Sequence, residues 1–319
     1  GSLGTSFYGM PVVDHLMAHL APTMLIFVTG TVLSFLLGQW LGKATAWRGP
    51  SFLSSTAVFS GIMLYTAFPP LLFFLISHLL SKRLTFARQL LWQSNVFSSL
   101  DRTRWRDFPL TPSTVIWYMM LSLVGALLIL FLVHKMLQRR GSQLPHWAHP
   151  PLLISVWIAI WFVVGFGPHG LELLKFALLP ILLYVLLSFG ETMLIMRTSM
   201  HETMGEAYVR AAQAKGLTSE AVRDRHAARN ALLPVLSRLV INIPYLLTGL
   251  VIVEDVVKWP GMGHVLFQSL YQQDMPTVMG GLLIVGVVAS LSRLSLDVLY
   301  AYLDPRIRHR THLAGGAND

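Results

Sequence analysis

Long apolar stretches recur along this chain, and they set its predicted architecture. A stretch of about 20 apolar residues can cross the hydrocarbon core of a bilayer. The stretches that meet or approach this length are residues 22–42, 55–77, 113–133, 151–167, 176–196, 231–253 and 277–303. A soluble core could bury one such helix, but not all of them. The pattern therefore predicts an all-α polytopic membrane protein with about seven spans in this chain.

The composition agrees with a membrane protein. Charged residues make up 12% of the 319 residues and hydrophobic residues 54%, whereas a soluble domain is about a quarter charged. The net charge is +9, but nucleic-acid binding needs a basic face on a soluble domain. No polar segment is long enough to form one, so we expect no nucleic-acid partner. The chain has no cysteine, which excludes disulfides and thiolate chemistry.

The basic residues gather at the ends of alternate apolar stretches and predict the topology. They follow the first, third, fifth and seventh stretch, so the positive-inside rule places these four flanks in the cytoplasm. The beginning of the chain then lies outside the cytoplasm. An outside beginning implies a further helix that runs outward before residue 1, so we expect eight spans in the complete protein.

One segment conflicts with this topology. Residues 78–112 should lie outside, yet they carry more basic than acidic residues. Residues 85–100 could form an interfacial amphipathic helix that places Phe86, Trp92 and Phe97 on the membrane. A solvated loop is the alternative interpretation.

The longest polar stretch on the predicted cytoplasmic side, residues 197–229, has helical signals. Ser199 with Glu202, and Thr203 with Glu206, both fit a capping box, in which a hydroxyl and a carboxylate satisfy the free amides that begin a helix. The spacing predicts two such helix starts.

A short helix over residues 206–215 should follow, because these residues are good helix formers. Gly216 stands where a left-handed residue closes a helix. Thr218 and Ser219 can cap the next helix, which enters the membrane near Leu232. A short helix held between two spans would be a rigid element able to transmit force from a partner.

The sequence carries no catalytic or metal-binding motif. The residues from Gly38 to Ala44 are one residue short of a phosphate-binding loop and lack its Ser or Thr. We therefore expect no catalytic residue, metal or cofactor in this chain. Gly38 and Gly42 are four residues apart, and this spacing permits close packing of two helices.

The polar stretch resembles a known family. Arg210-Ala211-Ala212-x-x-x-Gly216 is similar to the cytoplasmic loop motif Glu-Ala-Ala-x-x-x-Gly of binding-protein-dependent ABC importer permeases, with arginine in place of the glutamate. The likeness is greatest to the first permease subunit of the dipeptide/oligopeptide/nickel family. Further similarities are Gly4-Thr5-Ser6-Phe7 with Pro11-Val12, Glu254 with Trp259-Pro260-Gly261-Met262-Gly263, and Asp297 with Leu303-Asp304-Pro305-Arg306. The resemblance covers residues 1–75 and 176–310, and about ninety residues with two extra apolar stretches intervene.

The resemblance implies a type I ABC importer transmembrane domain in the bacterial cytoplasmic (inner) membrane. Members of the family pair as heterodimers with a second, related permease. Two ATPase subunits bind from the cytoplasm, and an external binding protein delivers the solute, most often a peptide. ATP and Mg then belong to the partner subunits, and this chain, without ATPase motifs, is not an enzyme.

The resemblance also assigns candidate site residues. The ATPase-coupling residues would be Glu206, Tyr208, Arg210, Ala211, Ala212, Lys215 and Gly216, with the small alanine pair fitting an ATPase groove. The external loop or gate would comprise Glu254, Trp259, Pro260, Gly261 and Gly263. A solvated helix is the alternative for the first set. A simple turn with an interfacial tryptophan is the alternative for the second.

Ionisable residues inside apolar stretches are functional candidates, because charge in lipid is costly. Arg293 and Asp297 are four residues apart and can neutralise each other on one helix face. Glu191 could be a proton or solute site, or it could form a hydrogen bond between subunits. Arg238 should face the bundle or snorkel. A secondary transporter or channel that uses Glu191, Arg293 and Asp297 as an ion relay is the alternative function.

Together these predictions divide the chain into six regions. They are an external segment (1–21), two transmembrane helices (22–77), an external basic segment (78–112), an inserted transmembrane hairpin (113–175), the core permease region (176–310) and a tail (311–319). Within the core region, residues 197–230 form the coupling loop and residues 254–276 the external loop.

Overall fold

The computed structural model describes residues 3–7, 9–81, 100, 102–139 and 149–303. All the regular secondary structure in these ranges is helical, as the sequence predicts. The predicted amphipathic helix over residues 85–100 and the predicted tail lie outside the described residues, apart from Leu100. Five described helices are long and apolar enough to span a membrane, or six if one bent pair is counted as a span.

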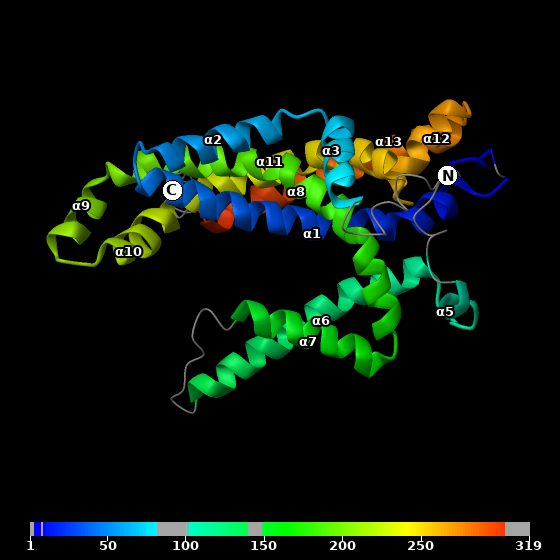
Figure 1. The fold of residues 1–319 in the computed structure, drawn as a ribbon, viewed down its shortest axis with the longest axis horizontal. Coiled ribbons are helices and arrows are strands. Elements are labelled where there is room, and N and C mark those ends of the chain that lie inside the picture. Colours follow the sequence, from blue (N-terminus) through cyan, green and yellow to red (C-terminus); the bar gives the residue numbers. More distant parts are fainter. Residues whose placement is uncertain (1–2, 8, 82–99, 101, 140–148, 304–319) are drawn as a thin grey trace, which may run out of the picture.

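Three long helices form the centre of the bundle (Figure 1). They are α1 (Val12–Trp47), α8 (Gly167–Met204) and α11 (Ala228–Val257). A main hydrophobic core lies between them and includes Leu25, Leu183 and Leu250. The predicted spans 22–42, 176–196 and 231–253 all lie within these helices.

Helices α1 and α8 approach closely because glycine removes side-chain bulk at their contact. A Cβ atom on Gly38 would lie 2.7 Å from the Phe189 carbonyl oxygen, and one on Gly42 would lie 2.7 Å from the Met193 carbonyl oxygen. Neither position therefore has room for a side chain. The predicted role of this glycine pair in helix packing is confirmed.

The second predicted span, residues 55–77, is not one straight helix. It is divided between α2 (Phe52–Tyr65) and α3 (Pro69–Ser81), with a bend of 113° between them. Two consecutive prolines, Pro69 and Pro70, disfavour helical backbone in the residues just before them. The 14 residues of α2 extend about 21 Å, which is shorter than the roughly 30 Å of a bilayer core.

A helical hairpin lies to one side of the bundle (Figure 1). It consists of α6 (Pro112–Arg139) and α7 (His149–Val164), and the short α5 (Arg102–Arg106) precedes it. The Ser122 hydroxyl accepts hydrogen bonds from the indoles of Trp157 and Trp161 at 3.0 and 2.9 Å, which joins the two helices. The apolar part of α7 is shorter than a full span.

The hairpin is attached to α1 beside a proline that removes one backbone hydrogen bond from that continuous helix. Pro22 has no N–H, so the carbonyl of Ala18 loses its partner within the helix. The Ser113 hydroxyl at the start of α6 donates to that carbonyl at 3.0 Å. A side chain from the hairpin therefore satisfies a backbone group that the α1 sequence leaves open.

The two ends of the bundle carry different short elements (Figure 1). One end holds α9 (Ala207–Ala214), α10 (Ser219–Ala221) and the π-helix η3 (Val222–Ala227). The other end holds the N-terminal segment and α12 (Met262–Tyr271), which leads into α13 (Met275–Leu303). Helix α8 runs unbroken through residues 175 and 176, where the sequence places a boundary between regions.

Candidate functional site

Helix α8 extends further into the polar stretch of residues 197–229 than the predicted capping boxes allow. Helix α8 continues through Ser199 to Met204, and both Ser199 and Thr203 are buried. The Thr203 hydroxyl donates to the Ser199 carbonyl at 2.7 Å, inside the helix. The two predicted helix starts at Ser199 and Thr203 are therefore wrong, because each hydroxyl lies within a continuing, buried helix.

The short helix itself is confirmed. The sequence predicts a helix over residues 206–215, and α9 runs from Ala207 to Ala214 with Glu206 as its N-cap and Lys215 as its C-cap. Gly216 has a φ of +76°, the left-handed conformation that favours glycine. Its N–H donates to the Gln213 carbonyl at 2.9 Å. The chain therefore turns sharply out of α9.

One face of α9 packs on the bundle and the other is exposed. Val209 and Ala212 are buried, at 0% and 5% exposure, in a cluster with Met196 and Met200 of α8. The remaining coupling candidates are exposed: Glu206, Tyr208, Arg210, Ala211, Lys215 and Gly216. Of the predicted alanine pair, Ala212 therefore faces the chain itself and Ala211 faces outward.

A second contact holds α9 to the next membrane helix. The side-chain amide of Asn230, in α11, donates to the Tyr208 hydroxyl at 2.8 Å. Since Val209 and Ala212 pack beside α8, the short helix is held between two long ones. Movement of α9 would therefore be passed to both of them.

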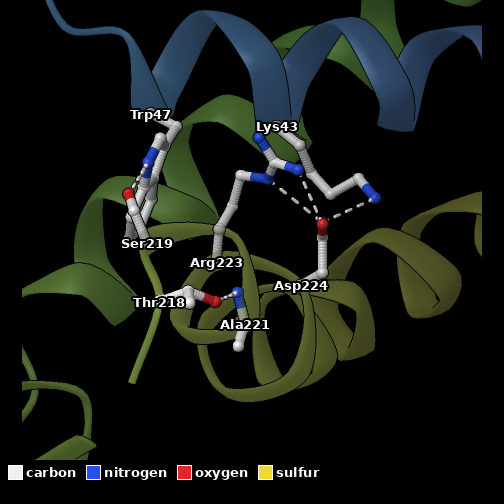
Figure 2. A network of polar contacts seen from close by, with 7 residues as sticks. All are labelled: Lys43, Trp47, Thr218, Ser219, Ala221, Arg223 and Asp224. Carbon is white, nitrogen blue, oxygen red and sulfur yellow. Dashed lines mark hydrogen bonds and ion pairs between the residues drawn. The ribbon is translucent and has the colours of Figure 1, made fainter. Parts of the chain in front are cut away.

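The segment after α9 is fixed to the end of α1 (Figure 2). Thr218 caps α10 as predicted, because its hydroxyl accepts from the Ala221 N–H at 3.3 Å. Ser219 has a different role, since its hydroxyl accepts from the Trp47 indole N–H at 3.0 Å. Trp47 is the last residue of α1. The start of α10 is thereby joined to a helix far away in the sequence.

Ionic contacts extend this junction one turn further, as Figure 2 shows. The Lys43 ammonium in α1 lies 3.3 Å from the Asp224 carboxylate in η3. The Arg223 guanidinium lies 2.6 Å from the same carboxylate. These groups are partly exposed, so each contact contributes roughly 0.2–1 kcal/mol. A single turn of π-helix is uncommon and is frequently found at functional sites.

The opposite end of the bundle is braced by a buried tryptophan. Trp259 is 0% exposed, and its indole N–H donates to the Pro22 carbonyl of α1 at 3.0 Å. Nearby, the Met262 N–H donates to the Thr23 hydroxyl at 2.7 Å. Trp259 is therefore not an interfacial tryptophan. It holds the segment after α11 against the part of α1 that contains Pro22.

A buried carboxylate leaves room only for glycine at two positions of this loop. Glu254 is 0% exposed, and its Oε2 accepts from the Gly263 N–H at 2.7 Å. A Cβ atom on Gly261 would collide with the same carboxylate, and one on Gly263 would lie 2.8 Å from it. Pro260 lies between Trp259 and Gly261, whose backbone groups are joined by a 2.7 Å hydrogen bond. The predicted loop residues therefore form one compact unit.

The N-terminal segment is clamped to this end by Asp274. Its Oδ2 accepts from the Phe7 N–H at 2.9 Å and from the Thr277 hydroxyl at 2.7 Å. Burial raises the pKa of Asp274, but the hydrogen bonds from Phe7 and Thr277 outweigh burial and hold this pKa below its ordinary value. The sequence gives no signal for this contact, which joins residues 267 positions apart.

Charged residues inside the bundle gather on α8 and α11. Glu191 Oε1 accepts from the Asn242 side-chain amide at 2.6 Å and lies 3.5 Å from the Arg238 guanidinium. Arg238 contacts the bundle through this carboxylate, but its side chain is 54% exposed, so the choice between facing the bundle and snorkelling stays a prediction. Arg293 is exposed on α13, whereas the side chain of Asp297 is outside the described part, so their pairing stays a prediction.

Asn242 was missed in the sequence although a signal was available. Arg238 and Asn242 are four residues apart on α11, so they lie on one face of that helix. Two polar residues on one face of an apolar span indicate a polar partner on a neighbouring helix. Glu191 is that partner.

The fold and its two ends define a class of protein. The chain is a multi-pass helical membrane protein with a short helix held outside the bundle at one end and a braced loop at the other. The family model for binding-protein-dependent transport system inner membrane components matches residues 96–309, more than half of the chain. This chain belongs to that family, and it is a multi-pass protein of the bacterial inner membrane. The matched residues include the α6–α7 hairpin.

Curated relatives are peptide permeases. The chain is 37% identical over 152 residues to the dipeptide transport system permease protein DppB of Escherichia coli, a match that covers 48% of this chain and 44% of that protein. It is 28% identical over 218 residues to DppB of Haemophilus influenzae, covering 66% and 64%. The match to DppB of Alkalihalophilus pseudofirmus is 24% identical over 310 residues, covering 97% and 78%. For the first of these relatives, the Escherichia coli protein, the chain spans about half of its length.

Proposed function

We propose that this chain is a permease subunit of an ATP-driven importer that moves dipeptides, oligopeptides or similar small solutes across the inner membrane by alternating access. The family membership and the names of the relatives, which are dipeptide permeases, support this proposal. The structural observation that carries it is α9. This helix is held between α8 and α11 and exposes Tyr208, Arg210 and Ala211 outside the bundle.

The proposed partners follow from the same arrangement. One of two ATPase subunits would bind the exposed face of α9 from the cytoplasm, with Arg210 and Lys215 pairing with acidic side chains there, and the other would bind the second permease. They would hold ATP and Mg and perform hydrolysis. A second, related permease would complete the membrane pathway, and an external binding protein would deliver the solute at the α12 end.

The proposed mechanism uses the contacts around α9 as a lever. Closure of the ATPase dimer would move α9, and the Ala212 and Asn230 contacts would pass this movement to α8 and α11. The contacts of Lys43 and Trp47 would carry α1 along with them. At the external end, the Trp259 and Glu254 unit would keep α1 and α11 moving together. A bundle with two discrete arrangements can then alternate between opposite openings.

Co-purification from membranes that contain the complete transporter tests this proposal. Ala211→Arg places a long cation on the exposed face of α9 and should abolish association with the ATPase that contacts this chain while membrane insertion is kept. The matched control is Tyr271→Arg, because Tyr271 is 82% exposed at the opposite end, and this variant should retain both ATPases. Normal ATPase association of the Ala211 variant would contradict the assignment of α9. ATP-independent uptake by this chain alone would favour a secondary transporter.

A further inference from the structure

A groove of about 520 Å³ opens on the bundle where the α2–α3 bend meets α8 and α11. This volume lies within the range of about 300–1,000 Å³ that holds small ligands. The groove is largely apolar, with polar groups from Tyr65, Glu191, Tyr245 and Thr248. Few and convergent polar groups in an apolar groove are the usual means of orienting a small ligand.

Glu191 lies where this groove adjoins a much smaller cavity of about 20 Å³ that Arg238 and Asn242 line. Asn242 fixes the carboxylate through a 2.6 Å hydrogen bond to Oε1. Arg238 approaches the same oxygen. Both contacts are made at Oε1, so Oε2 is the oxygen that a ligand cation would approach.

The ion pair is held loosely for two charges inside a membrane helix bundle. The guanidinium contacts Glu191 through Nε at 3.5 Å, whereas a strong Arg–carboxylate pair is bidentate at about 2.7–2.9 Å. The side chain of Arg238 is 54% exposed, against 22% for Glu191. The exposed side chain of Arg238 could turn the two outer nitrogens of its guanidinium toward another carboxylate.

We propose that Glu191 and Arg238 recognise the two charged ends of a short zwitterionic peptide in this groove. Glu191 receives the ligand ammonium group, and Arg238 leaves Glu191 to receive the ligand carboxylate. In the ligand-free groove the two side chains neutralise each other. A peptide of two residues spans at most about 7 Å and a hydrogen bond at each end adds about 3 Å, so Arg238 must swing away from Glu191 to admit it. This inference rests on the proposed function and adds a substrate-recognition site to it.

The test is equilibrium binding of alanyl-alanine to the purified transporter complex in nanodiscs, without the binding protein. The two comparison ligands are N-acetyl-alanyl-alanine, which lacks the ammonium group, and alanyl-alaninamide, which lacks the carboxylate. The wild-type complex should bind the zwitterion at least about tenfold more tightly than either capped peptide, because each cap removes one charged hydrogen bond. Glu191→Gln should lose the preference for the free amino end and keep the preference for the free carboxyl end.

Arg238→Gln should show the reverse pattern, and Arg238→Lys should recover part of the carboxylate preference, since it restores the charge without the fork. Arg48→Gln is the control, because it removes an exposed arginine that does not line the groove and should leave both preferences unchanged. If Glu191→Gln prevents assembly, Glu191→Asp should weaken the amino-end preference instead.

Unchanged preferences in the Glu191 and Arg238 variants, or equal binding of all three peptides by the wild type, would overturn this site. Either result would leave the permease assignment standing, because that assignment depends on ATPase association through α9. Conversely, loss of the α9 assignment would not by itself alter the three binding constants. The two proposals therefore fail independently.

Discussion

Lys43 and Asp224 are 181 residues apart in the sequence, yet the lysine Nζ lies 3.3 Å from the aspartate Oδ1. This pair connects the end of α1 to the π-helical turn that follows α9 and α10 (Figure 2). The contact places a group from the first described membrane helix beside the segment proposed to meet the ATPases. It therefore belongs to the route by which force would enter the bundle.

The exposure of this pair limits its contribution to stability. Lys43→Ala and Asp224→Ala should each lower the free energy of unfolding by about 1 kcal/mol or less, because exposed ion pairs are screened by solvent and salt. A double-mutant cycle in detergent should give a coupling energy of roughly 0.2–1 kcal/mol that decreases at high salt. A coupling above about 2 kcal/mol would show that the pair is a main structural support instead.

The glycine contact between α1 and α8 predicts that two glycine-to-alanine substitutions change the thermal unfolding midpoint in opposite directions. Alanine is a better helix former than glycine by about 1 kcal/mol, so Gly286→Ala, where a Cβ meets nothing within 4 Å, should raise the thermal unfolding midpoint slightly. Gly42→Ala should lower it, because its Cβ would lie 2.7 Å from the Met193 carbonyl oxygen and force the helices apart. The same sign for both variants would contradict the close packing.

The Asp274 clamp predicts a pH dependence. Its contacts favour the carboxylate and lower its native pKa, so its contribution to stability is complete above the ordinary carboxyl pKa of about 3.9. That contribution is lost as the pH falls through the lower native value. The difference in thermal midpoint between wild type and Asp274→Asn should therefore be constant from pH 7 to about pH 5 and shrink in stronger acid.

A matched variant separates this effect from general acid sensitivity. Asp14→Asn changes an exposed carboxylate in the first turn of α1 and should alter the thermal midpoint little at any pH. An Asp274→Asn difference that grew on acidification would mean that the clamp favours the protonated acid. That outcome would contradict the hydrogen bonds to Phe7 and Thr277 as described.

The sequence predicted the elements whose causes are local. Apolar length marked the long helices, and the left-handed preference of Gly216 and the hydroxyl of Thr218 marked the end of α9 and the start of α10. The two wrong helix starts were also predicted from a local pattern. Ser199 and Thr203 fit a capping motif, but they lie inside a helix that tertiary packing keeps continuous. The sequence pattern alone does not distinguish one continuous helix from two helices with a new start at these residues.

Contacts between distant residues were beyond the sequence. The burial of Trp259 depends on the carbonyl of Pro22, 237 positions away. The outward direction of Ala211 and the inward direction of Ala212 depend on where α8 lies. Neither fact follows from the periodicity of one segment. Which of the candidate residues form an exposed surface was therefore not predictable from the sequence.

The most direct test of the central claim uses the absence of cysteine from the natural chain. With a single Ala211→Cys substitution on α9, a bifunctional maleimide should link this chain, in native membranes, to an ATPase subunit that carries a cysteine on the surface facing α9. The yield should change when ATP is bound. A Tyr271→Cys variant should give no such product. An Ala211→Cys protein that is labelled from outside the cell by an impermeant maleimide, and forms no link to the ATPase, would contradict the account.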